Sequence, residues 1–330
     1  MNGSVSSIAG TGSYLPGRRV ENQEVANLLG IEPSYIFRVS GIQTRYWAEP
    51  NEECSFLAEQ ASRRALDQAG LVPEDLDAIL VSSTSPDMIF PSTACLLQAR
   101  LGIKGIPAFD LSASCSGFLY GLSMADCFIR AGQFQRCLVV ASEIKSRSLD
   151  FKDLSTAILF GDGAGAAILE RSSSSDVGIV SIRIYADGNY HDLVKIAGGG
   201  SRHPLSQSVL DSGGHTLRIR GSQLFRIAIG RLAQAVRDHL EHEKLMVGQL
   251  DQVIFHQANG RMLAQFCKKL GVPSDRCMTM IEQVGNTSSA SLPMALDRAN
   301  RDGRLKMGDR IMLGAFGGGL TWGTALVRWG

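Results

Sequence analysis

The sequence predicts an α/β protein made of two similar halves. Short apolar runs typical of buried strands alternate with amphipathic stretches typical of helices. Residues 66–82 resemble residues 240–256, because both pass from a helix end through a short linker and a Leu-Asp pair into a buried strand. Glycine-rich turns between apolar runs recur at residues 161–165 and 316–319. A duplicated unit whose sheets are covered on both faces explains these observations.

The elements of the first half follow from apolar spacing and turn residues. Asn22 is expected to cap the first helix, and Gly70 to end the second. Residues 35–47 mix arginine with aromatic side chains and are expected to form a loop. We expect strands at 5–12, 78–82, 137–142 and 166–169, and helices at 22–29, 56–69 and 93–101.

The second half follows a polar, low-complexity connector at residues 172–175. This connector divides the chain into halves 1–172 and 173–330. We expect strands at 253–255, 311–313 and 324–327, and helices beginning at Met262 and spanning 293–301.

Composition excludes several classes of function. The 330 residues are 44% hydrophobic and 20% charged, which is enough for a large core. The net charge of +1 gives no field that would recruit nucleic acid or a membrane surface. Seven scattered cysteines show no metal-ligand spacing, and no signal peptide or long apolar span is present. We therefore expect a cytoplasmic protein with reduced cysteines and no metal site.

Residues 106–120 contain the strongest candidate for a reactive group. The first part is strand-like, the second part is helix-like, and Cys115 lies at the junction. Free backbone N–H groups at a helix start favour the thiolate, and small neighbours at 113–117 let a substrate approach the sulfur. Cys115 is therefore a candidate nucleophile. The alternative is that it is a small buried hydrophobe, as many free cysteines are.

Two polar residues in the second half are candidates to act with Cys115. A buried run at 253–255 places His256 at a strand end, whereas the other five histidines lie in turn-like or charged stretches. Asn286 lies in a turn of small residues and is suited to donate a hydrogen bond. That turn is alternatively a capping segment for the helix at 293–301. A cysteine, a histidine and an asparagine on strand or helix ends suit acyl chemistry on a thioester.

Five motifs resemble the β-ketoacyl-acyl-carrier-protein synthase III family. They are SCSGF at 114–118, FGDGAG at 160–165, HQAN at 256–259, GNTS at 285–288 and FGGGLTWG at 316–323. The resemblance runs from residue 10 to the C-terminus. It implies the thiolase fold, with two βαβαβαββ halves forming a five-layer αβαβα sandwich, and a homodimer.

The resemblance also implies a role for each motif. Cys115 would take an acyl group from a donor thioester. His256 and Asn286 would hydrogen-bond the carbonyl of a malonyl thioester and stabilise the enolate formed when CO₂ leaves. That enolate would attack the acyl group and give a β-ketoacyl thioester. The backbone N–H groups of Cys115 and Gly318 would form the oxyanion hole, and Phe90 would reach across the dimer and limit acyl length.

The same resemblance implies substrates and a partner. No cofactor is bound permanently, because acyl-CoA or acyl-carrier-protein thioesters are the substrates. A basic rim would dock the acidic acyl carrier protein, although such residues alone suit a solvated helix face. The docking candidates are Arg226, Arg261, Lys268 and Lys269.

Several positions depart from the family pattern. Tyr35 and Leu154 stand where a Trp and an Arg sandwich the adenine of coenzyme A, and leucine offers neither a cation nor a π-face. Val284 stands where histidine is common, and Asp87 is unusual before Phe90. Our hypothesis is a specialised condensing enzyme in fatty-acid initiation or a related pathway, with a longer or unusual acyl donor.

Other interpretations remain open from the sequence. One is an acyltransferase or ester-forming enzyme that uses the Cys115 thioester without decarboxylation. Another is a non-catalytic partner subunit of a condensing heterodimer, although such a subunit would be expected to lack one of the three candidate residues. A thiolase is disfavoured because residues 316–323 contain no second cysteine. A dinucleotide site at 161–165 is disfavoured because a strand-like run follows that turn.

Overall fold

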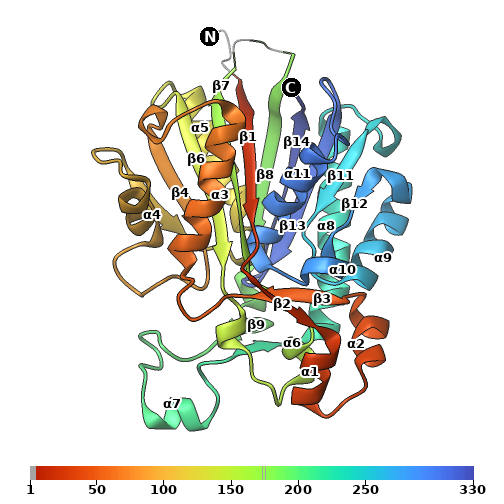
Figure 1. Ribbon diagram of the computed structural model, residues 1–330. Coiled ribbons are helices and arrows are strands. Elements are labelled where there is room, and N and C mark those ends of the chain that lie inside the picture. The colour runs from red at the N-terminus through yellow and green to blue at the C-terminus, as the bar shows by residue number, and fades with distance from the viewer. Residues whose placement is uncertain (1–4, 173, 175) are drawn as a thin grey trace.

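The computed structural model describes residues 5–172, 174 and 176–330, and its core is two five-stranded sheets (Figure 1). The first sheet contains, in spatial order, β1 (Ser6–Tyr14), β7 (Gly163–Arg171), β6 (Arg136–Glu143), β4 (Ala78–Ser82) and β5 (Ala108–Leu111). The second contains β12 (Cys277–Met278), β11 (Gln252–Phe255), β13 (Arg310–Gly317), β14 (Thr321–Arg328) and β8 (Gly178–Ala186).

The two sheets share one topology. In the first, β4 runs parallel to β5 and β6, whereas β6–β7 and β7–β1 are antiparallel. In the second, β11 runs parallel to β12 and β13, whereas β13–β14 and β14–β8 are antiparallel. The duplication seen in the sequence is therefore present in strand order and direction, and the predicted α/β fold class is confirmed.

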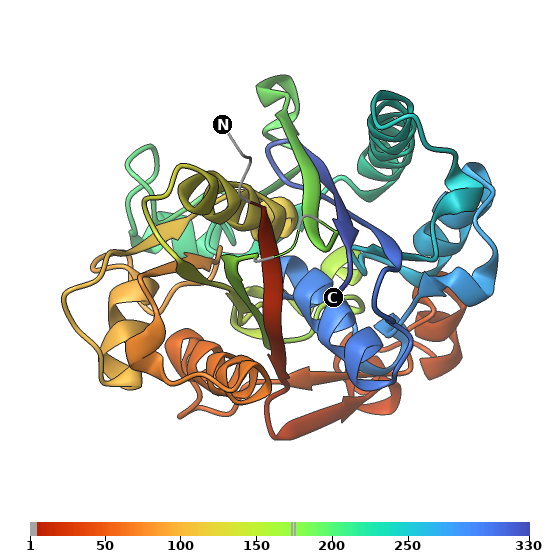
Figure 2. The same cartoon turned by 90° about the horizontal axis from the view of Figure 1, so that it is seen from above.

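Helices cover both faces of each sheet. One outer layer is formed by α3 (Cys54–Ala69) and α4 (Thr93–Leu101) against the first sheet, and the other by α8 (Gly221–His242) and α9 (Gly260–Leu270) beside the second. Between the sheets lie α5 (Gly117–Arg130) and α11 (Ser291–Arg301), each of which contacts strands of both sheets. Figure 2 shows this layered arrangement from above.

The amino-acid pattern explains why the parallel strands lie inside. All five residues of β4, Ala-Ile-Leu-Val-Ser, are buried, as expected of a parallel strand covered on both faces. The first α-helix of the central layer, α5, buries Phe118, Leu122 and Ile129 at helical spacing in the core between the sheets. The sheet ends are thereby held firmly where the polar motifs emerge.

Smaller elements lie at one end of the sandwich (Figure 1). One antiparallel pair is formed by β2 (Arg18–Glu21) and β3 (Thr44–Trp47), and a second by β9 (Val194–Ile196) and β10 (Leu217–Ile219). The short helices are α1 (Asn22–Leu29), α2 (Pro33–Ser40), α6 (Leu154–Ala157), α7 (Gln207–Asp211) and α10 (Ile281–Val284).

The predictions for residues 22–47 were only partly right. The first helix spans Asn22–Leu29 as expected, but its N-cap residue is Glu21. The Asn22 amide instead donates to the Ile42 carbonyl and accepts from buried Arg45. The predicted loop is wrong, because α2 buries Ile36 and β3 pairs with β2. Polar and aromatic residues concealed two short elements whose partners are distant in sequence.

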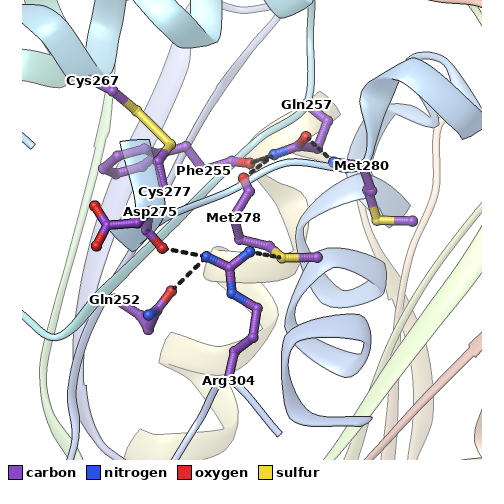
Figure 3. The surroundings of a disulfide bond; sticks show 9 residues. All are labelled: Gln252, Phe255, Gln257, Cys267, Asp275, Cys277, Met278, Met280 and Arg304. Atoms are coloured by element: carbon purple, nitrogen blue, oxygen red, sulfur yellow. Dashed lines mark hydrogen bonds between the residues drawn. A yellow bond between two sulfur atoms is a disulfide. The ribbon is translucent and has the colours of Figure 1, made fainter. Parts of the chain in front are cut away.

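One disulfide joins Cys267 on α9 to Cys277 on β12 (Figure 3). The expectation that the cysteines are reduced is therefore wrong for this pair. Its formation depends on the tertiary packing of the end of α9 beside an edge strand, which the cysteine spacing did not reveal. The free cysteines are Cys54, Cys95, Cys115, Cys127 and Cys137.

The predicted connector at 172–175 includes residues 173 and 175, which lie outside the described residues. The division of the chain at 172/173 therefore stays a prediction.

Within the described ranges, no helix has both the length and the apolar character needed to cross a membrane.

Candidate active site

Cys115 lies between β5 and α5, as the sequence predicted. A 3₁₀ turn at Ser114–Ser116 precedes α5, and Ser114 has a φ of 50°. The end of β13 packs directly against this turn. A Cβ atom on Gly317 would lie 2.5 Å from the Cys115 nitrogen, so only glycine allows that approach. Close packing of the two halves thus brings residues 317–319 beside the candidate nucleophile.

The Cys115 thiol contacts two hydroxyl groups. Its Sγ lies 3.4 Å from Ser288 Oγ and 3.8 Å from Ser114 Oγ. Burial raises the thiol pKa, the hydroxyl of Ser288 opposes the increase, Glu143 adds to it and Lys145 opposes it. Burial of the thiol thus opposes the stabilisation of the thiolate expected from the helix-start N–H groups, which stays a prediction.

His256 follows β11 and is almost completely buried. Its Nδ1 lies 2.6 Å from Ser291 Oγ, at the start of α11, and its ring stands edge-on to Phe316. The Ser291 oxygen also accepts a hydrogen bond from the Gln257 N–H at 3.2 Å. Burial lowers the His256 pKa to about 3, and only the Glu143 charge opposes this. The imidazole is therefore neutral at physiological pH.

Asn286 is fixed by contacts of both its backbone and its side chain. Its backbone N–H donates to the Leu159 carbonyl, and its own carbonyl accepts from the Gly161 N–H. The side chain donates to the Ala258 carbonyl at 3.2 Å and accepts from the Ser288 N–H at 2.9 Å. The capping alternative is wrong for α11, because the N-cap residue of that helix is Ala290 and no side chain caps it. The Asn286 oxygen instead accepts the N–H of Ser288, the first residue of the 3₁₀ turn Ser288–Ala290.

A buried ion pair lies next to these residues and was not predicted from the sequence. Glu143, the last residue of β6, is fully buried, and its Oε2 lies 3.0 Å from Nζ of Lys145, which is 4% exposed. Glu143 accepts hydrogen bonds from the hydroxyl groups of Ser85 at 2.6 Å, Ser288 at 3.1 Å and Ser289 at 2.8 Å. The available signal was a pair of charges directly after an apolar parallel strand, where sites tend to form.

A cavity of about 710 Å³ opens onto Cys115. Cys115, Ser288 and Gly318 line it, whereas His256 and Asn286 are not among its lining residues. Asn286 connects to the cavity through Ser288, which contacts both Asn286 and Cys115. The remaining walls come from the ends of β4, β5 and β6 and from β9 and β10.

The proposed substrate-entrance residues lie together in a groove that Cys115 does not line. Tyr35 and Leu154 line one surface groove, and Arg38 lines it with them. The Arg38 guanidinium lies 5.5 Å from the centre of the Tyr35 ring. Arg38 therefore supplies a cation to this groove, although Leu154 supplies none. Comparing only the Tyr35 and Leu154 positions with the family pattern did not reveal it.

Phe90 lies outside the cavity of this single chain. It is 86% exposed, beside Ile89, which is also 86% exposed, and Met88 at 46%. The unusual Asp87 accepts hydrogen bonds from Ser55 and Thr93, so it ties the starts of α3 and α4 together.

The four docking candidates are all exposed, with Arg226 on α8 and the other three on α9. Arg261 donates to the Arg38 carbonyl at 3.1 Å, and its guanidinium lies over the Phe37 ring. The start of α9 therefore adjoins the groove of Tyr35, whereas Lys268 and Lys269 lie in the last turn of α9.

A duplicated five-layer sandwich with a cysteine at a central helix start defines a thiolase-fold condensing acyltransferase. Known proteins agree. Residues 109–188 match the family described as 3-oxoacyl-[acyl-carrier-protein (ACP)] synthase III, and residues 240–329 match its C-terminal family. The chain belongs to the β-ketoacyl-acyl-carrier-protein synthase III family, as its motifs predicted, and is an enzyme.

Individual relatives cover nearly the whole chain. The β-ketoacyl-[acyl-carrier-protein] synthase III of Methylococcus capsulatus is 45% identical, with 98% of this chain and 99% of the relative covered. That of Alkalilimnicola ehrlichii is 43% identical, with 99% and 100% covered. The 3-oxoacyl-[acyl-carrier-protein] synthase III structure from Aquifex aeolicus has a TM-score of 0.90 and 38% identity, covering 98% and 100%. The priming β-ketosynthase of the R1128 polyketide pathway has a TM-score of 0.91 and 34% identity, covering 99% and 97%.

Proposed function

We propose that this enzyme condenses a Cys115-bound acyl group with malonyl-acyl-carrier protein and releases CO₂, in fatty-acid initiation or a related specialised pathway. The observation that carries the proposal is a series of contacts that runs from the cavity toward the other two candidate residues. Cys115 and Ser288 line the cavity, Ser288 contacts the sulfur and donates its N–H to Asn286, and the Asn286 amide donates to the carbonyl of Ala258, two residues after His256.

The first step is acyl transfer to the cysteine. Cys115 Sγ attacks the donor carbonyl, the donor C–S bond breaks, and the thiol proton passes to the leaving thiolate. The backbone N–H groups of Cys115 and Gly318 are the proposed oxyanion hole. A well-placed donor of this type contributes about 3 kcal/mol to transition-state stabilisation.

The second step needs neutral hydrogen-bond donors. Because Ser291 Oγ accepts from the Gln257 N–H, its hydroxyl hydrogen is available to His256 Nδ1. The ring proton then lies on Nε2, which is free to donate to the malonyl thioester oxygen beside the Asn286 amide. Loss of CO₂ leaves an enolate that these donors stabilise. Its carbon attacks the acyl carbonyl, and the Cys115 sulfur leaves as thiolate.

The remaining expectations belong to this proposal. The exposed apolar segment 88–90 supports a homodimer, in which Phe90 would enter the partner's acyl pocket. The exposed cations of α9 support docking of acyl carrier protein beside the groove of Tyr35 and Leu154. We further propose a cytoplasmic enzyme with no permanent cofactor and with halves 1–172 and 173–330.

The test is intact-protein mass after incubation with acyl-CoA and acyl-carrier-protein thioesters. The wild type is expected to gain one acyl group, and Cys115→Ala is expected to gain none. Cys95→Ala and Cys127→Ala are matched controls, because both remove an exposed thiol and should leave the mass gain intact. Malonyl-acyl-carrier protein should then discharge the acyl group with release of CO₂.

Each alternative predicts another result. Acylation followed by transfer without CO₂ release would indicate an ester-forming enzyme. No acylation by any donor would contradict the proposal and favour the partner-subunit interpretation.

A further inference from the structure

A buried ammonium group lines the cavity that holds the Cys115 thiol. Lys145 follows β6, is 4% exposed and lines the same cavity as Cys115 and Ser288. A wall meant only for an aliphatic chain has no need for a buried cation, because burying a charge costs free energy unless it is paired and hydrogen-bonded. Lys145 therefore calls for an explanation beyond packing.

One of the three N–H groups of the Lys145 ammonium has no partner among the described residues. An ammonium group carries three N–H donors. Among the described residues, Nζ donates to Thr84 Oγ1 and lies 3.0 Å from Glu143 Oε2. These two contacts leave one donor for the cavity.

The wall around Lys145 is polar but has few free groups. Ser83, Thr84 and Asp110 also line the cavity there. The Asp110 carboxylate already accepts the N–H groups of Thr93 and Ala94, each at 2.8 Å. The Ser83 hydroxyl accepts the Ser85 N–H and lies 3.4 Å from Cys54 Sγ. Lys145 is therefore the donor on this wall with unused capacity.

We propose that Lys145 selects the acyl group, by donating a hydrogen bond to an oxygen atom on that group beyond its thioester carbonyl. The inference rests on the proposed function, because it requires an acyl group on Cys115. The preferred donors are then oxygenated acyl thioesters, such as 3-hydroxyacyl or 3-oxoacyl thioesters, rather than unsubstituted alkyl ones.

The charge of the site favours a neutral oxygen over a carboxylate. Lys145 and Glu143 already neutralise one another within hydrogen-bond distance. A carboxylate on the acyl group would add a net negative charge to a buried site, which is costly without a second cation. The other lysine that lines the cavity, Lys195, is exposed on β9 and is not buried beside this ion pair.

The size of the preference for oxygenated acyl groups follows from the cost of leaving one N–H of Lys145 without a partner. Covering the third N–H of Lys145 with methylene groups would leave it without a partner, whereas an oxygen would satisfy it. A buried unsatisfied donor corresponds to a roughly ten- to hundredfold loss in the relevant rate or affinity.

The experiment compares rates of Cys115 acylation by four CoA thioesters of equal carbon number, followed by intact mass. These are hexanoyl-, 3-hydroxyhexanoyl-, 3-oxohexanoyl- and adipyl-CoA. The expected wild-type result is at least a tenfold advantage for the hydroxyl or oxo compound over hexanoyl-CoA, with adipyl-CoA no better than hexanoyl-CoA. Ratios within one variant are compared, because changes in thiol reactivity cancel.

Three variants make the test specific. Lys145→Met should abolish the advantage, and Lys195→Met should keep it, although both remove a cavity lysine. If Lys145→Met does not fold, Glu143→Gln combined with Lys145→Met removes both charges and should give the same ratio. Folding is checked by thermal unfolding.

The outcomes separate this inference from the proposed function. Preference for hexanoyl- or adipyl-CoA, or an advantage that survives Lys145→Met, would overturn the inference alone. Absence of acylation by these donors and by the wider thioester panel would overturn the proposed function, and this inference with it.

Discussion

Replacing Glu143 with glutamine is expected to make the Cys115 thiol more reactive. Successive contacts of 3.4 Å from Sγ to Ser288 Oγ and 3.1 Å from that oxygen to Glu143 Oε1 place the carboxylate within about 6.5 Å of the sulfur. At an effective dielectric constant of about 20, two negative charges at this distance repel by about 2.5 kcal/mol. Removing that repulsion raises the thiolate population about 70-fold.

The positive charge of Lys145 has the opposite effect on the reactivity of the thiol. Lys145 lowers the Cys115 pKa, so Lys145→Met should slow reactions of the thiol at neutral pH. Either single change leaves one buried charge without its partner and is expected to cost about 3 kcal/mol or more of folding stability. The double variant, Glu143→Gln with Lys145→Met, should return the thiol reactivity toward that of the wild type.

The assay is the rate of Cys115 alkylation by iodoacetamide as a function of pH, followed by intact mass with Cys115→Ala as background. The titratable groups that act on the thiol pKa are Glu143 and Lys145, and Glu143 also acts on the neutral His256. Asp162→Asn is a matched control, because Asp162 is another buried carboxylate but bonds to Ser146 and Ala48 instead. Equal or slower alkylation of Glu143→Gln, in a folded protein, would refute the electrostatic reasoning.

Three further outcomes are expected. Because the His256 pKa is lowered to about 3 from an ordinary 6.5, the folded state binds fewer protons than the unfolded state between these values. The contribution of His256 to the free energy of unfolding is complete above about pH 6.5 and is reduced by about 2 kcal/mol at pH 5. Urea unfolding of the wild type and of His256→Asn, measured as a function of pH, should show this difference. Parallel curves of unfolding free energy against pH would contradict it. Asn286→Ala should retain Cys115 acylation in single-turnover mass measurements but lose about 100-fold or more in decarboxylation, measured as CO₂ release; equal losses in both steps would argue against a role specific to the second step. Gly317→Ala should lower the melting temperature and the acylation rate together, since its Cβ would lie 2.5 Å from the Cys115 nitrogen; unchanged values for both would show that the β13 end is not packed as described.

Where the sequence predicted correctly, local pattern and tertiary burial agree. β4 is entirely buried and apolar up to its last residue, Ser82, and the small residues around Cys115 occur at a strand-to-helix junction. Local signals failed where distant partners decide the outcome. Glu143 and Lys145 look like surface charges in sequence, but serine hydroxyl groups from the other half and from the β4 loop surround the carboxylate.

Tertiary burial also explains why the pKa of Cys115 is raised. A helix start is visible in the sequence, but the depth of burial depends on packing that the sequence pattern does not report. The α2 and β3 elements and the disulfide of Cys267 were missed for a related reason, because each is defined by a neighbour that folding brings near.

The hydrogen bonds from Ser288 and Ser289 to Glu143 connect residues about 145 positions apart, one group from each half of the chain. The environment of Cys115 is thus completed only when the two halves dock, and neither half contains it alone. Cys115 reactivity therefore reports assembly of the halves as well as catalysis. During refolding, the time at which the alkylation rate of Cys115 reaches its native value would therefore report the docking of the two halves.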